Sequence, residues 1–367
     1  MRLKRVIGWS AGLAALALVA VGLVGYWTSS NSCDDPSPVA PSHLIKAVVQ
    51  CEYGPPEVLT LTAIEKPVPA DSELLIRVRA ASVNPLDWHF MRGTPYIARL
   101  VMGLRKPKTI RVGVDFSGTV ESVGRSVTKF KPGDEVFGGK TGAFAEYLTM
   151  PESGSVVLKP ANLSFEQAAA AGVAAVTALQ GLRDVGHLEP GQKVLINGAS
   201  GGVGTFAVQI AKALGAEVTG VTSTKNLELV RSIGADQVVD YTKENFTTAG
   251  VRYDVILDNV GNHSLSAFRR VANPKGRYII VGGPAGRWID PLPRALGAMV
   301  MSRFVSQDMA MFIADMTPKD LAVLADLMAA GKVTPVIDRQ YKLVEIAEAV
   351  RYLETGRARG KVVVTVE

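Results

Sequence analysis

The sequence predicts an α/β protein in which a β-rich domain precedes a doubly wound parallel sheet, with a transmembrane helix in front of both. Short, partly alternating apolar runs separated by Gly and Pro fill the chain from Ile45 onward, as is typical of strands. After Ser164, apolar strands alternate with helical segments, which indicates a parallel sheet. The stretch Val6–Trp27 carries no charge. With 367 residues, the chain is long enough for two or three domains.

The N-terminal stretch is long enough to cross a membrane. Basic residues precede 22 uncharged residues that end in Tyr26–Trp27, an aromatic pair suited to an interface. A spanning helix needs about 20 apolar residues, whereas the apolar region of a cleaved signal peptide has about 7–15. We therefore expect an uncleaved single-pass anchor over residues 1–28 and a linker rich in Ser and Pro over residues 29–44. A signal peptide cleaved near Ser30 and a lipoprotein site at Cys33 are the alternatives.

Charge and cysteine content exclude several classes of protein. The formal net charge of +6 includes three basic residues at the N-terminus, and no basic patch with interleaved aromatic residues predicts a nucleic-acid partner. The only two cysteines, Cys33 and Cys51, exclude a disulfide framework and a multi-cysteine zinc site. A bridge between these two requires an oxidising compartment, and we expect none.

The first folded domain is expected over residues 45–165. Strands are predicted at residues 47–49, 74–80, 118–123 and 130–137, the last of these runs beginning with a turn.

The second domain is expected over residues 166–310. The capping box Ser164-Phe165-Glu166-Gln167 predicts the start of an alanine-rich helix through Val176, and a second helix is predicted over 178–185. Strands are then predicted at 194–196, 217–221, 238–239, 255–257 and 278–281, alternating with helices at 205–214, 227–233 and 265–271. Residues 311–367 should contain helices at 319–330 and 343–355 and a strand at 361–366 that returns to the first domain.

A glycine-rich turn follows the first strand of the second domain. Lys193–Gly204 runs from an apolar strand through Ala199-Ser200-Gly201-Gly202-Val203-Gly204 into a helix. Gly201 and Gly204 match the last two glycines of the G-x-G-x-x-G pattern, with Ala199 at the first position. Such a turn presents main-chain N–H groups and a helix N-terminus to the pyrophosphate of a dinucleotide.

The next strand ends in a segment that indicates which dinucleotide binds. A site for NAD has Asp or Glu about twenty residues after the glycine pattern, where it binds the ribose hydroxyls. Here the chain reads Thr222-Ser223-Thr224-Lys225-Asn226. Hydroxyls, an amide and a cation suit a ribose 2′-phosphate, which a carboxylate would repel. The sequence therefore predicts NADPH.

Several motifs together resemble the medium-chain dehydrogenase/reductase superfamily, in its zinc-free quinone oxidoreductase and alkenal/enone reductase branch. The resemblance runs from Lys46 to Glu367. It rests on the glycine-rich turn and on four further motifs: Ser82-Val83-Asn84-Pro85-Leu86-Asp87-Trp88, Gly113-Val114-Asp115-Phe116-Ser117-Gly118, Lys131-Pro132-Gly133-Asp134-Glu135-Val136 and Gly360-Lys361-Val362-Val363. It implies a GroES-like catalytic domain that is split in sequence, a Rossmann domain inserted before its last segment, and a site between the two.

The same motifs depart from the zinc-dependent relatives. These have Cys where Asn84 stands and Gly-His-Glu where Gly113-Val114-Asp115 stands. Without thiolate or imidazole ligands no Lewis acid polarises an alcohol or carbonyl oxygen. We therefore expect no metal and an acceptor that is already electron-poor, either a quinone or the activated C=C of an α,β-unsaturated carbonyl.

The resemblance implies a set of cofactor-binding residues. Thr177 matches a threonine near the nicotinamide, the glycine-rich turn would bind the pyrophosphate, and Ser223 and Lys225 would bind the 2′-phosphate. The full set comprises Thr177, Ser200, Gly201, Gly202, Val203, Gly204, Thr222, Ser223, Lys225, Asn226, Tyr241, Asn259, Val260, Val281, Gly282 and Lys361.

The substrate side is expected around residues 84–96. The Asn84 amide could donate to a substrate carbonyl oxygen as charge develops there, although an Asn-Pro turn is the structural alternative. His89 could relay a proton to the reduced product, or could be an ordinary surface histidine. Asp87, Trp88 and Tyr96 are expected at the substrate pocket, the first two bracing its loop.

Two other functions compete with an NADPH-dependent reductase. One is a membrane-tethered NADPH-binding protein with little turnover, and the other, less favoured, is a zinc alcohol dehydrogenase. The basic N-terminus places the folded domains on the far side of the membrane, whereas cofactor supply favours the cytoplasmic side, so the side stays open. A homodimer is implied by the resemblance, with the apolar stretch Ala298–Val305 at the matching place.

Overall fold

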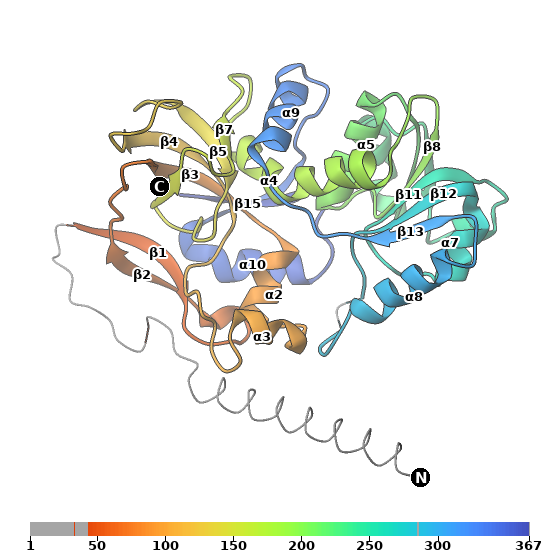
Figure 1. Ribbon diagram of the computed structural model, residues 1–367, viewed down its shortest axis with the longest axis horizontal. Helices are drawn as coiled ribbons and strands as arrows, with labels where there is room; N and C mark the ends of the chain where they lie inside the picture. Colours follow the sequence, from red (N-terminus) through yellow and green to blue (C-terminus); the bar gives the residue numbers. More distant parts are fainter. Residues whose placement is uncertain (1–32, 34–42, 285, 367) are drawn as a thin grey trace, which may run out of the picture.

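The computed structural model describes Cys33, residues 43–284 and residues 286–366. Two lobes lie side by side, a strand-rich lobe formed by both ends of the described chain and a second lobe built on a parallel sheet (Figure 1). The predicted anchor over residues 1–28 and nearly all of the predicted linker lie outside the described residues. Among the residues that are described, no helix has the length and apolar character to cross a membrane.

The strand-rich lobe is an antiparallel structure that the last strand of the chain completes. β1 (Leu44–Gln50) pairs with β2 (Leu59–Glu65). A seven-stranded sheet has the order β14-β15-β3-β4-β5-β7, with β6 paired to β3. Its strands are β3 (Glu73–Val83), β4 (Asp115–Val123), β5 (Glu135–Gly139), β6 (Tyr147–Pro151), β7 (Val156–Leu158), β14 (Ile337–Lys342) and β15 (Lys361–Thr365). Leu74, Ile76 and Phe116 are fully buried in its core.

The predicted strands of this lobe overlap β1, β3, β4 and β5, but the sheet is larger than predicted. β15 pairs antiparallel with β3, so the C-terminal segment does return to the first domain. β14, which lies parallel to β15, was not predicted because Ile337–Lys342 is polar and partly exposed at the edge of the sheet.

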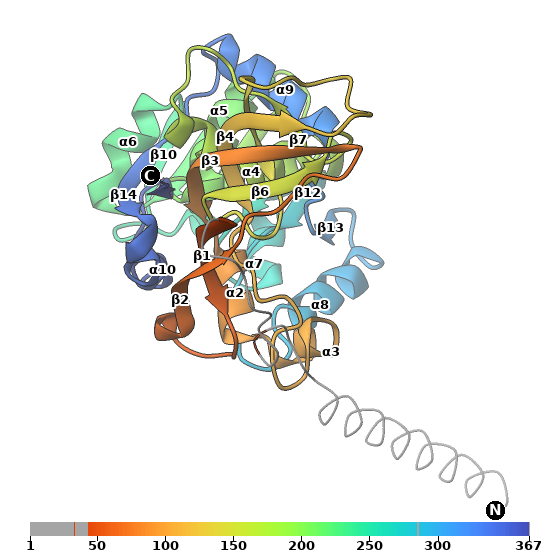
Figure 2. The ribbon, with the colours of Figure 1, turned by 90° about the vertical axis from the view of Figure 1, so that its left-hand side faces the viewer.

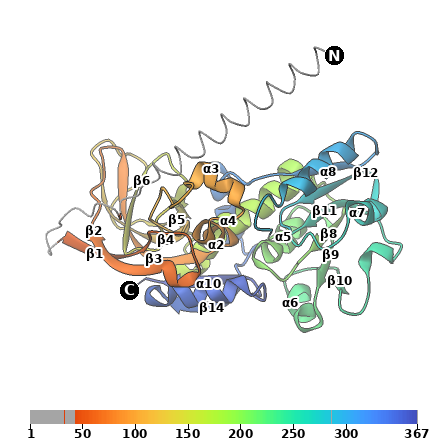
Figure 3. The same cartoon turned by 90° about the horizontal axis from the view of Figure 1, so that it is seen from below.

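The second lobe contains the predicted parallel sheet. Six strands, all parallel, have the order β10-β9-β8-β11-β12-β13. They are β8 (Lys193–Asn197), β9 (Glu217–Thr222), β10 (Gln237–Asp240), β11 (Tyr253–Asp258), β12 (Ala272–Ile280) and β13 (Asp308–Met311). The order reverses between β8 and β11, and ligands of such sheets bind beyond the carboxyl ends of the strands at this point. Helices lie on both faces of the sheet (Figures 1 and 3).

The helices follow the predicted pattern with a few additions. In the strand-rich lobe these are η2 (Pro56–Val58), α2 (Pro85–Arg92), η3 (Tyr96–Ala98), α3 (Arg99–Met102), η7 (Leu343–Glu345) and α10 (Ile346–Glu354). In and around the parallel sheet they are α5 (Gly202–Ala213), η5 (Thr224–Asn226), α6 (Leu227–Ser232), η6 (Phe246–Thr248), α7 (Leu265–Val271), α8 (Leu292–Ser302) and α9 (Pro318–Ala329). α2, α3 and α8 were not predicted, because each is a short or exposed segment close to Pro or Gly residues.

One long helix connects the lobes, and the prediction of two separate helices at this place is wrong. α4 (Phe165–Gln180) continues directly into a π-helical turn, η4 (Gly181–Val185). The capping box at its start is confirmed, with the Gln167 N–H donating to Ser164 Oγ at 3.2 Å and the Ser164 N–H donating to Gln167 Oε1 at 3.0 Å. The helix continues past Val176 because the alanine-rich sequence there contains no residue that breaks a helix.

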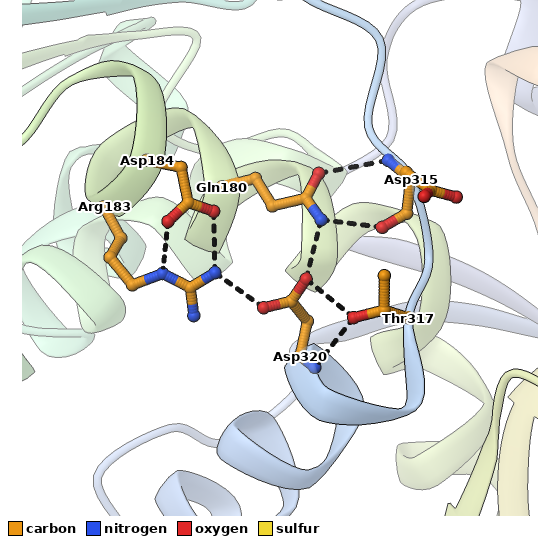
Figure 4. Close-up of polar contacts among 6 residues, drawn as sticks. All are labelled: Gln180, Arg183, Asp184, Asp315, Thr317 and Asp320. Carbon is orange, nitrogen blue, oxygen red and sulfur yellow. Dashed lines mark hydrogen bonds and ion pairs between the residues drawn. The ribbon is translucent and has the colours of Figure 1, made fainter.

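Polar side chains attach the segment that returns from the parallel sheet to the end of α4 (Figure 4). Gln180 binds the backbone of Asp315 in both directions, at 2.6 and 3.1 Å, and donates to Asp320 at 2.7 Å. Arg183 also donates to the Asp320 carboxylate, at 2.6 Å. Burial raises the pKa of Asp320, but hydrogen bonds from Arg183, Gln180 and Thr317 outweigh burial and hold it below its usual value. The charged form of Asp320 therefore stabilises this junction.

Contrary to expectation, the two cysteines form a disulfide bridge. Cys51 follows β1 directly, and its Cα lies 5.8 Å from that of Cys33, within the range that a bridge requires. The sequence did not predict this bridge, because the spacing of two cysteines 18 residues apart does not distinguish a disulfide from two free thiols. The bridge attaches the chain that precedes residue 33 to the end of β1.

We predict that Asp320→Asn lowers the free energy of unfolding by about 1–3 kcal/mol at neutral pH, because a buried acceptor of charged hydrogen bonds is lost. Since the pKa is lower in the folded than in the unfolded state, this stabilisation is complete above the unfolded-state pKa of about 3.9 and disappears as the pH falls through the folded value. Denaturant unfolding at several pH values measures it. Asp326→Asn, an exposed position of the same helix, is the control. An equal effect of the two variants at pH 7 would contradict the prediction.

Candidate active site

The glycine-rich turn lies at the carboxyl end of β8, where the strand order reverses. Gly198 has φ 79°, which favours glycine, and a Cβ on Gly204 would lie 2.1 Å from the Gly198 carbonyl oxygen. By contrast, a Cβ on Gly201 would have only the Gly198 carbonyl oxygen within 4 Å, at 3.4 Å. Gly204 is therefore required by the fold, whereas Gly201 leaves free space above the turn. Gly201, Gly202 and Val203 are partly exposed at the N-terminus of α5, where main-chain N–H groups bind anions.

The residues predicted for the ribose phosphate gather around the Ser200 hydroxyl. Ser200 Oγ accepts hydrogen bonds from Thr222 Oγ1 at 2.8 Å and Asn226 Nδ2 at 3.1 Å, and Asn226 also donates to Ser223 Oγ at 3.3 Å. The amide oxygen of Asn226 is buried and has no hydrogen-bond partner among the described residues. Lys225 is exposed beside this cluster.

Tyr241 and Asp240 form the outer edge of the same region. Tyr241 is half exposed, and its N–H donates to the Thr222 carbonyl at 3.0 Å. Hydrogen bonds, first from Thr224 and then from Thr242, lower the pKa of Asp240 to about 2. The Asp240 carboxylate is therefore ionised and already bound by the hydroxyl groups of Thr224, beside Lys225, and of Thr242, after β10.

The loops after β11 and β12 meet at the same end of the sheet. The N–H groups of Val281 and Gly282 both donate to the Asp258 carbonyl, at 3.0 and 3.1 Å. A Cβ on Gly282 would lie 2.3 Å from the carbonyl oxygen of Asn259, so the loops are in direct contact. Val260 is 40% exposed, and Asn259 has a buried amide oxygen without a partner among the described residues. The predicted residues Asn259, Val260, Val281 and Gly282 thus lie together.

A buried carboxylate that the sequence analysis missed orients these loops. Asp258 Oδ1 accepts the N–H groups of Val260 and Gly261, at 3.1 and 2.9 Å, together with Asn197 Nδ2 at 2.8 Å. Asp258 Oδ2 accepts the Tyr278 hydroxyl at 2.6 Å and lies 3.3 Å from Arg294 of α8. Burial and the Asp258 charge raise the pKa of Tyr278 well above its usual value. The sequence signal that could have identified Asp258 is its position as an acid at the end of an apolar strand.

Asn84, predicted as a donor to substrate, is fully engaged within the protein. Its side chain is 1% exposed, with Nδ2 donating to Asp115 Oδ2 at 2.9 Å and to the Ser82 carbonyl at 3.4 Å. Its Oδ1 accepts Lys361 Nζ at 2.5 Å. Both amide hydrogens are therefore directed at protein acceptors. This arrangement favours the structural alternative of an Asn-Pro turn, in which Asn84 positions its neighbours.

Lys361 and Asp115 form the centre of this network. Lys361 Nζ lies 3.7 Å from Asp115 Oδ2 and 3.3 Å from the Val83 carbonyl, and both charged side chains are buried. Burial lowers the pKa of Lys361, and the two acids beside it offset part of that effect. Asp115 Oδ1 also accepts the Val173 N–H of α4, at 2.8 Å. Asp115 was not predicted as a site residue, although it is an acid at the fully buried start of β4.

Lys361 lies beneath the glycine-rich turn rather than at its open side. A Cβ on Gly202 would lie 3.3 Å from Lys361 Cδ, and the Gly360 N–H donates to the Ser200 carbonyl at 2.9 Å. With an exposure of 3%, Lys361 supports the turn from below, and the prediction that it binds the cofactor directly is not supported by this position.

A pocket of about 540 Å³ lies where the two lobes meet, on the side of α2 and α3. Trp88 and Tyr96 line it, as predicted for the substrate pocket. The other lining residues are Tyr53, Gly54, Pro55, Arg92, Thr94, Arg99, Gly286 and Arg287. The ring of Tyr96 contacts that of Trp288 from the other lobe, with centroids 5.1 Å apart.

Asp87 and His89 are not among the residues that line this pocket. Asp87 is buried and accepts the Asn84 N–H at 2.7 Å, and burial raises its pKa to about 7. It braces the start of α2, as expected. His89 Nδ1 donates to the Thr94 carbonyl at 2.9 Å, its ring stacks on Trp88, and burial lowers its pKa. At neutral pH its imidazole is therefore uncharged.

Thr177 lies inside α4 rather than at a helix start. Its hydroxyl donates to the Val173 carbonyl at 2.7 Å, four residues earlier, and the residue is partly exposed. Its position on the helix that joins the lobes stays compatible with the nicotinamide role that the resemblance implies. In the apolar stretch Ala298–Val305, Ala298 is buried whereas Met299, Val300 and Phe304 are exposed.

The described residues fit a dinucleotide. Main-chain N–H groups at the start of α5, free space above Gly201, and unpartnered amide oxygens on Asn226 and Asn259 all lie around the carboxyl ends of β8, β9 and β11. Buried polar atoms rarely lack a partner unless a ligand or water supplies it.

We predict that Gly201→Ala leaves the free energy of unfolding almost unchanged but weakens NADPH binding about tenfold or more, because a methyl group enters the space above the turn and costs about one charged hydrogen bond. Gly204→Ala should instead destabilise the fold itself. Calorimetric titration and denaturant unfolding of both variants check this. Unchanged NADPH affinity in Gly201→Ala would show that the turn does not bind the cofactor.

Two family models match the chain. The model of an alcohol dehydrogenase GroES-like domain matches residues 70–161, and the model of a zinc-binding dehydrogenase matches residues 233–364. The first covers much of the antiparallel lobe. The second covers part of the parallel sheet and the segment that returns from it.

Curated relatives and solved structures resemble the chain over most of its length. The 2-methylene-furan-3-one reductase of Solanum lycopersicum is 33% identical, and the alignment covers 87% of this chain and 79% of the relative. The chloroplastic NADPH-dependent alkenal/one oxidoreductase of Arabidopsis thaliana is 32% identical with the same coverage. The structure of the quinone oxidoreductase from Coxiella burnetii superposes with a TM-score of 0.77 at 30% identity, covering 88% of this chain and 100% of that one. The chain therefore belongs to the medium-chain dehydrogenase/reductase superfamily and is an NAD(P)H-dependent oxidoreductase.

Proposed function

We propose that the chain is a zinc-independent, NADPH-dependent reductase of quinones or of the activated C=C bond of α,β-unsaturated carbonyls. The observation that carries this proposal is the position of the Lys361 ammonium. It lies against Asn84 and beside Asp115, two positions that match parts of the zinc-binding motifs in zinc-dependent relatives.

The residues around Lys361 do not fit a zinc ion. Asn84 and Val114 replace the thiolate and imidazole ligands, and zinc sites in proteins are built from Cys, His and carboxylate groups. Within the residues that the structure describes, no three His, Cys, Asp or Glu side chains come together to hold a metal. Asp115, the one acid at a matching position, already has hydrogen bonds to both oxygens.

The choice of NADPH over NADH is supported by the region around Ser200. Hydroxyl groups from Ser200, Thr222 and Ser223 and the exposed Lys225 surround the place expected for the ribose 2′ position. The Asp240 carboxylate at the edge of this region is bound by Thr224 and Thr242. A phosphate would gain charged hydrogen bonds here, and a ribose hydroxyl would find no free carboxylate.

Bound NADPH supplies a hydride, which can add to a carbon of a conjugated acceptor while a proton from solvent completes the reduction. The chain's own residues position the reactants. The loops held by Asp258 and the glycine-rich turn define the cofactor side, and Trp88 and Tyr96 present aromatic surfaces in the pocket. Such aromatic walls can pack against a planar acceptor such as a quinone or an enone.

We predict that Lys225→Ala lowers the preference for NADPH over NADH about 10- to 100-fold, because a charged hydrogen bond worth about 1.5–3 kcal/mol is lost. The kcat/KM ratio for the two cofactors measures this preference. Lys193→Ala, at the opposite end of β8, removes the same charge and should leave the ratio unchanged. A preference that persists in Lys225→Ala would exclude a role for this residue in phosphate binding.

We also predict that His89→Gln keeps the kcat and the pH profile of the parent enzyme. The lowered pKa leaves the imidazole uncharged at neutral pH, and Nδ1 is already bound to the Thr94 carbonyl. The kcat of parent and variant, measured over about two pH units on each side of neutrality, checks this. If the variant lost a titration that the parent shows, His89 would be the proton relay after all.

The proposed reaction is tested by NADPH oxidation with a panel of quinones and enones, using the purified full chain whose zinc content has been measured. Acceptor-dependent oxidation that survives a chelator is expected. Tight NADPH binding without oxidation of any acceptor would favour a binding protein with little turnover. Activity that is lost with the chelator and restored by zinc would overturn zinc independence.

A further inference from the structure

We propose that one face of the strand-rich lobe, together with a neighbouring loop of the other lobe, docks onto a phospholipid bilayer that contains anionic lipid. The α3 face is defined by Ile97, Leu100, Val101, Trp288 and Ile289, whose exposed fractions are 41%, 66%, 77%, 72% and 49%. Single exposed apolar side chains are common on protein surfaces. A cluster of large ones marks a surface that binds a membrane, another protein or a ligand.

These residues come from two segments but form one surface. The N–H groups of Tyr96 and Ile97 donate to the carbonyls of Arg287 and Trp288, at 2.8 and 3.2 Å. The rings of Tyr96 and Trp288 are also in edge contact. α3 and α8, which flank this junction, lie on the same side of the molecule, opposite α10 (Figures 2 and 3).

The chain around α3 carries only positive charge. Residues 88–114 contain six Lys or Arg residues and no Asp or Glu. Four of these, Arg99, Arg105, Lys106 and Lys108, lie in or just after α3. On the neighbouring loop, Arg287 precedes Trp288 and the exposed Asp290 follows Ile289. Exposed apolar side chains bordered by basic ones are the composition of a surface that binds at the headgroups of anionic lipids.

The predicted anchor would bring this face close to the membrane. Cys33 follows Trp27, the aromatic residue at the end of the predicted spanning stretch, by six residues, which span about 20 Å at most. The bridge joins Cys33 to Cys51, two residues before Tyr53. The Tyr53 hydroxyl donates to the Gly103 carbonyl at 2.8 Å, and its ring contacts Arg99 of α3. The bridge therefore attaches the predicted membrane segment beside the α3 face rather than elsewhere on the fold.

A functional consequence rests on the proposed reductase activity. Tyr96, Arg99 and Arg287 border the α3 face and also line the pocket of about 540 Å³. With the α3 face on the bilayer, an apolar acceptor dissolved in the lipid would reach the pocket without crossing bulk water.

The docking itself is tested without any measurement of activity. The full chain is reconstituted in vesicles of phosphatidylcholine and phosphatidylglycerol, with an environment-sensitive fluorophore on Leu100→Cys or on Trp288→Cys. Val344→Cys is the matched control, because Val344 is 66% exposed like Leu100 but lies in η7 next to α10, on the opposite side. The two native cysteines are bridged and should not react, which labelling of the parent chain verifies.

We expect the emission at positions 100 and 288 to shift to the blue and to be quenched by brominated lipid, while position 344 stays unquenched. Removing phosphatidylglycerol or raising the salt concentration should weaken the quenching. Equal quenching at positions 100 and 344 would overturn the proposal. A blue shift at position 100 without quenching by lipid would also overturn it, because protein, either a second copy or the chain's own N-terminal segment, would then cover the face.

Discussion

The buried carboxylate of Asp115 is the group on which the assembly of the site depends. It accepts hydrogen bonds from Ser82 of β3, from the backbone of α4 and from Asn84, and it lies beside the Lys361 ammonium of β15. A Cβ on Gly172 would lie 2.1 Å from this carboxylate, so α4 packs directly against it. Removing one partner of such a buried pair leaves an uncompensated charge and costs about 3–5 kcal/mol. β15 therefore holds in place both the Asn84 loop of the strand-rich lobe and the glycine-rich turn.

This constraint explains why the nucleotide domain interrupts the catalytic domain. Asn84 and Lys361 are 277 residues apart, yet they are joined by a hydrogen bond. The Gly360 backbone in turn binds Ser200 in the glycine-rich turn. The last strand thus contacts both lobes at the point where cofactor and acceptor are expected to meet, and the site is complete only when β15 has paired with β3.

The parts of the molecule that follow from local patterns were predictable from the sequence. The strands and helices of the parallel sheet and the capping box at Ser164 have clear periodic or capping signals. What the sequence could not show is which polar atoms are already used inside the fold. Asn84 has the right chemistry to bind a carbonyl oxygen, but Asp115 and Lys361 engage its amide. Asp258 was overlooked for the opposite reason, since nothing local shows that Tyr278 and Arg294 converge on it.

The Cys33–Cys51 bridge and the basic N-terminus both bear on the membrane orientation of the chain, which stays a prediction. Disulfides persist in oxidising compartments, and positive residues before an apolar segment stay on the cytoplasmic side. If the predicted anchor spans a membrane, both features favour folded lobes on its far side, where a reductase would need NADPH from within that compartment. Exposed thiols at positions 33 and 51 in the chain isolated from its native cells would instead agree with a cytoplasmic site.

The central claim is that hydride passes directly from NADPH to an electron-poor acceptor at a site without zinc. Deuterium tracing tests it most directly, with NADPH labelled separately on each face of C4 and an enone as acceptor. The account predicts that deuterium from one face appears at the β-carbon of the saturated product, with protein that contains no stoichiometric zinc. Product without deuterium from either face, or transfer that occurs only after zinc is added, would contradict it.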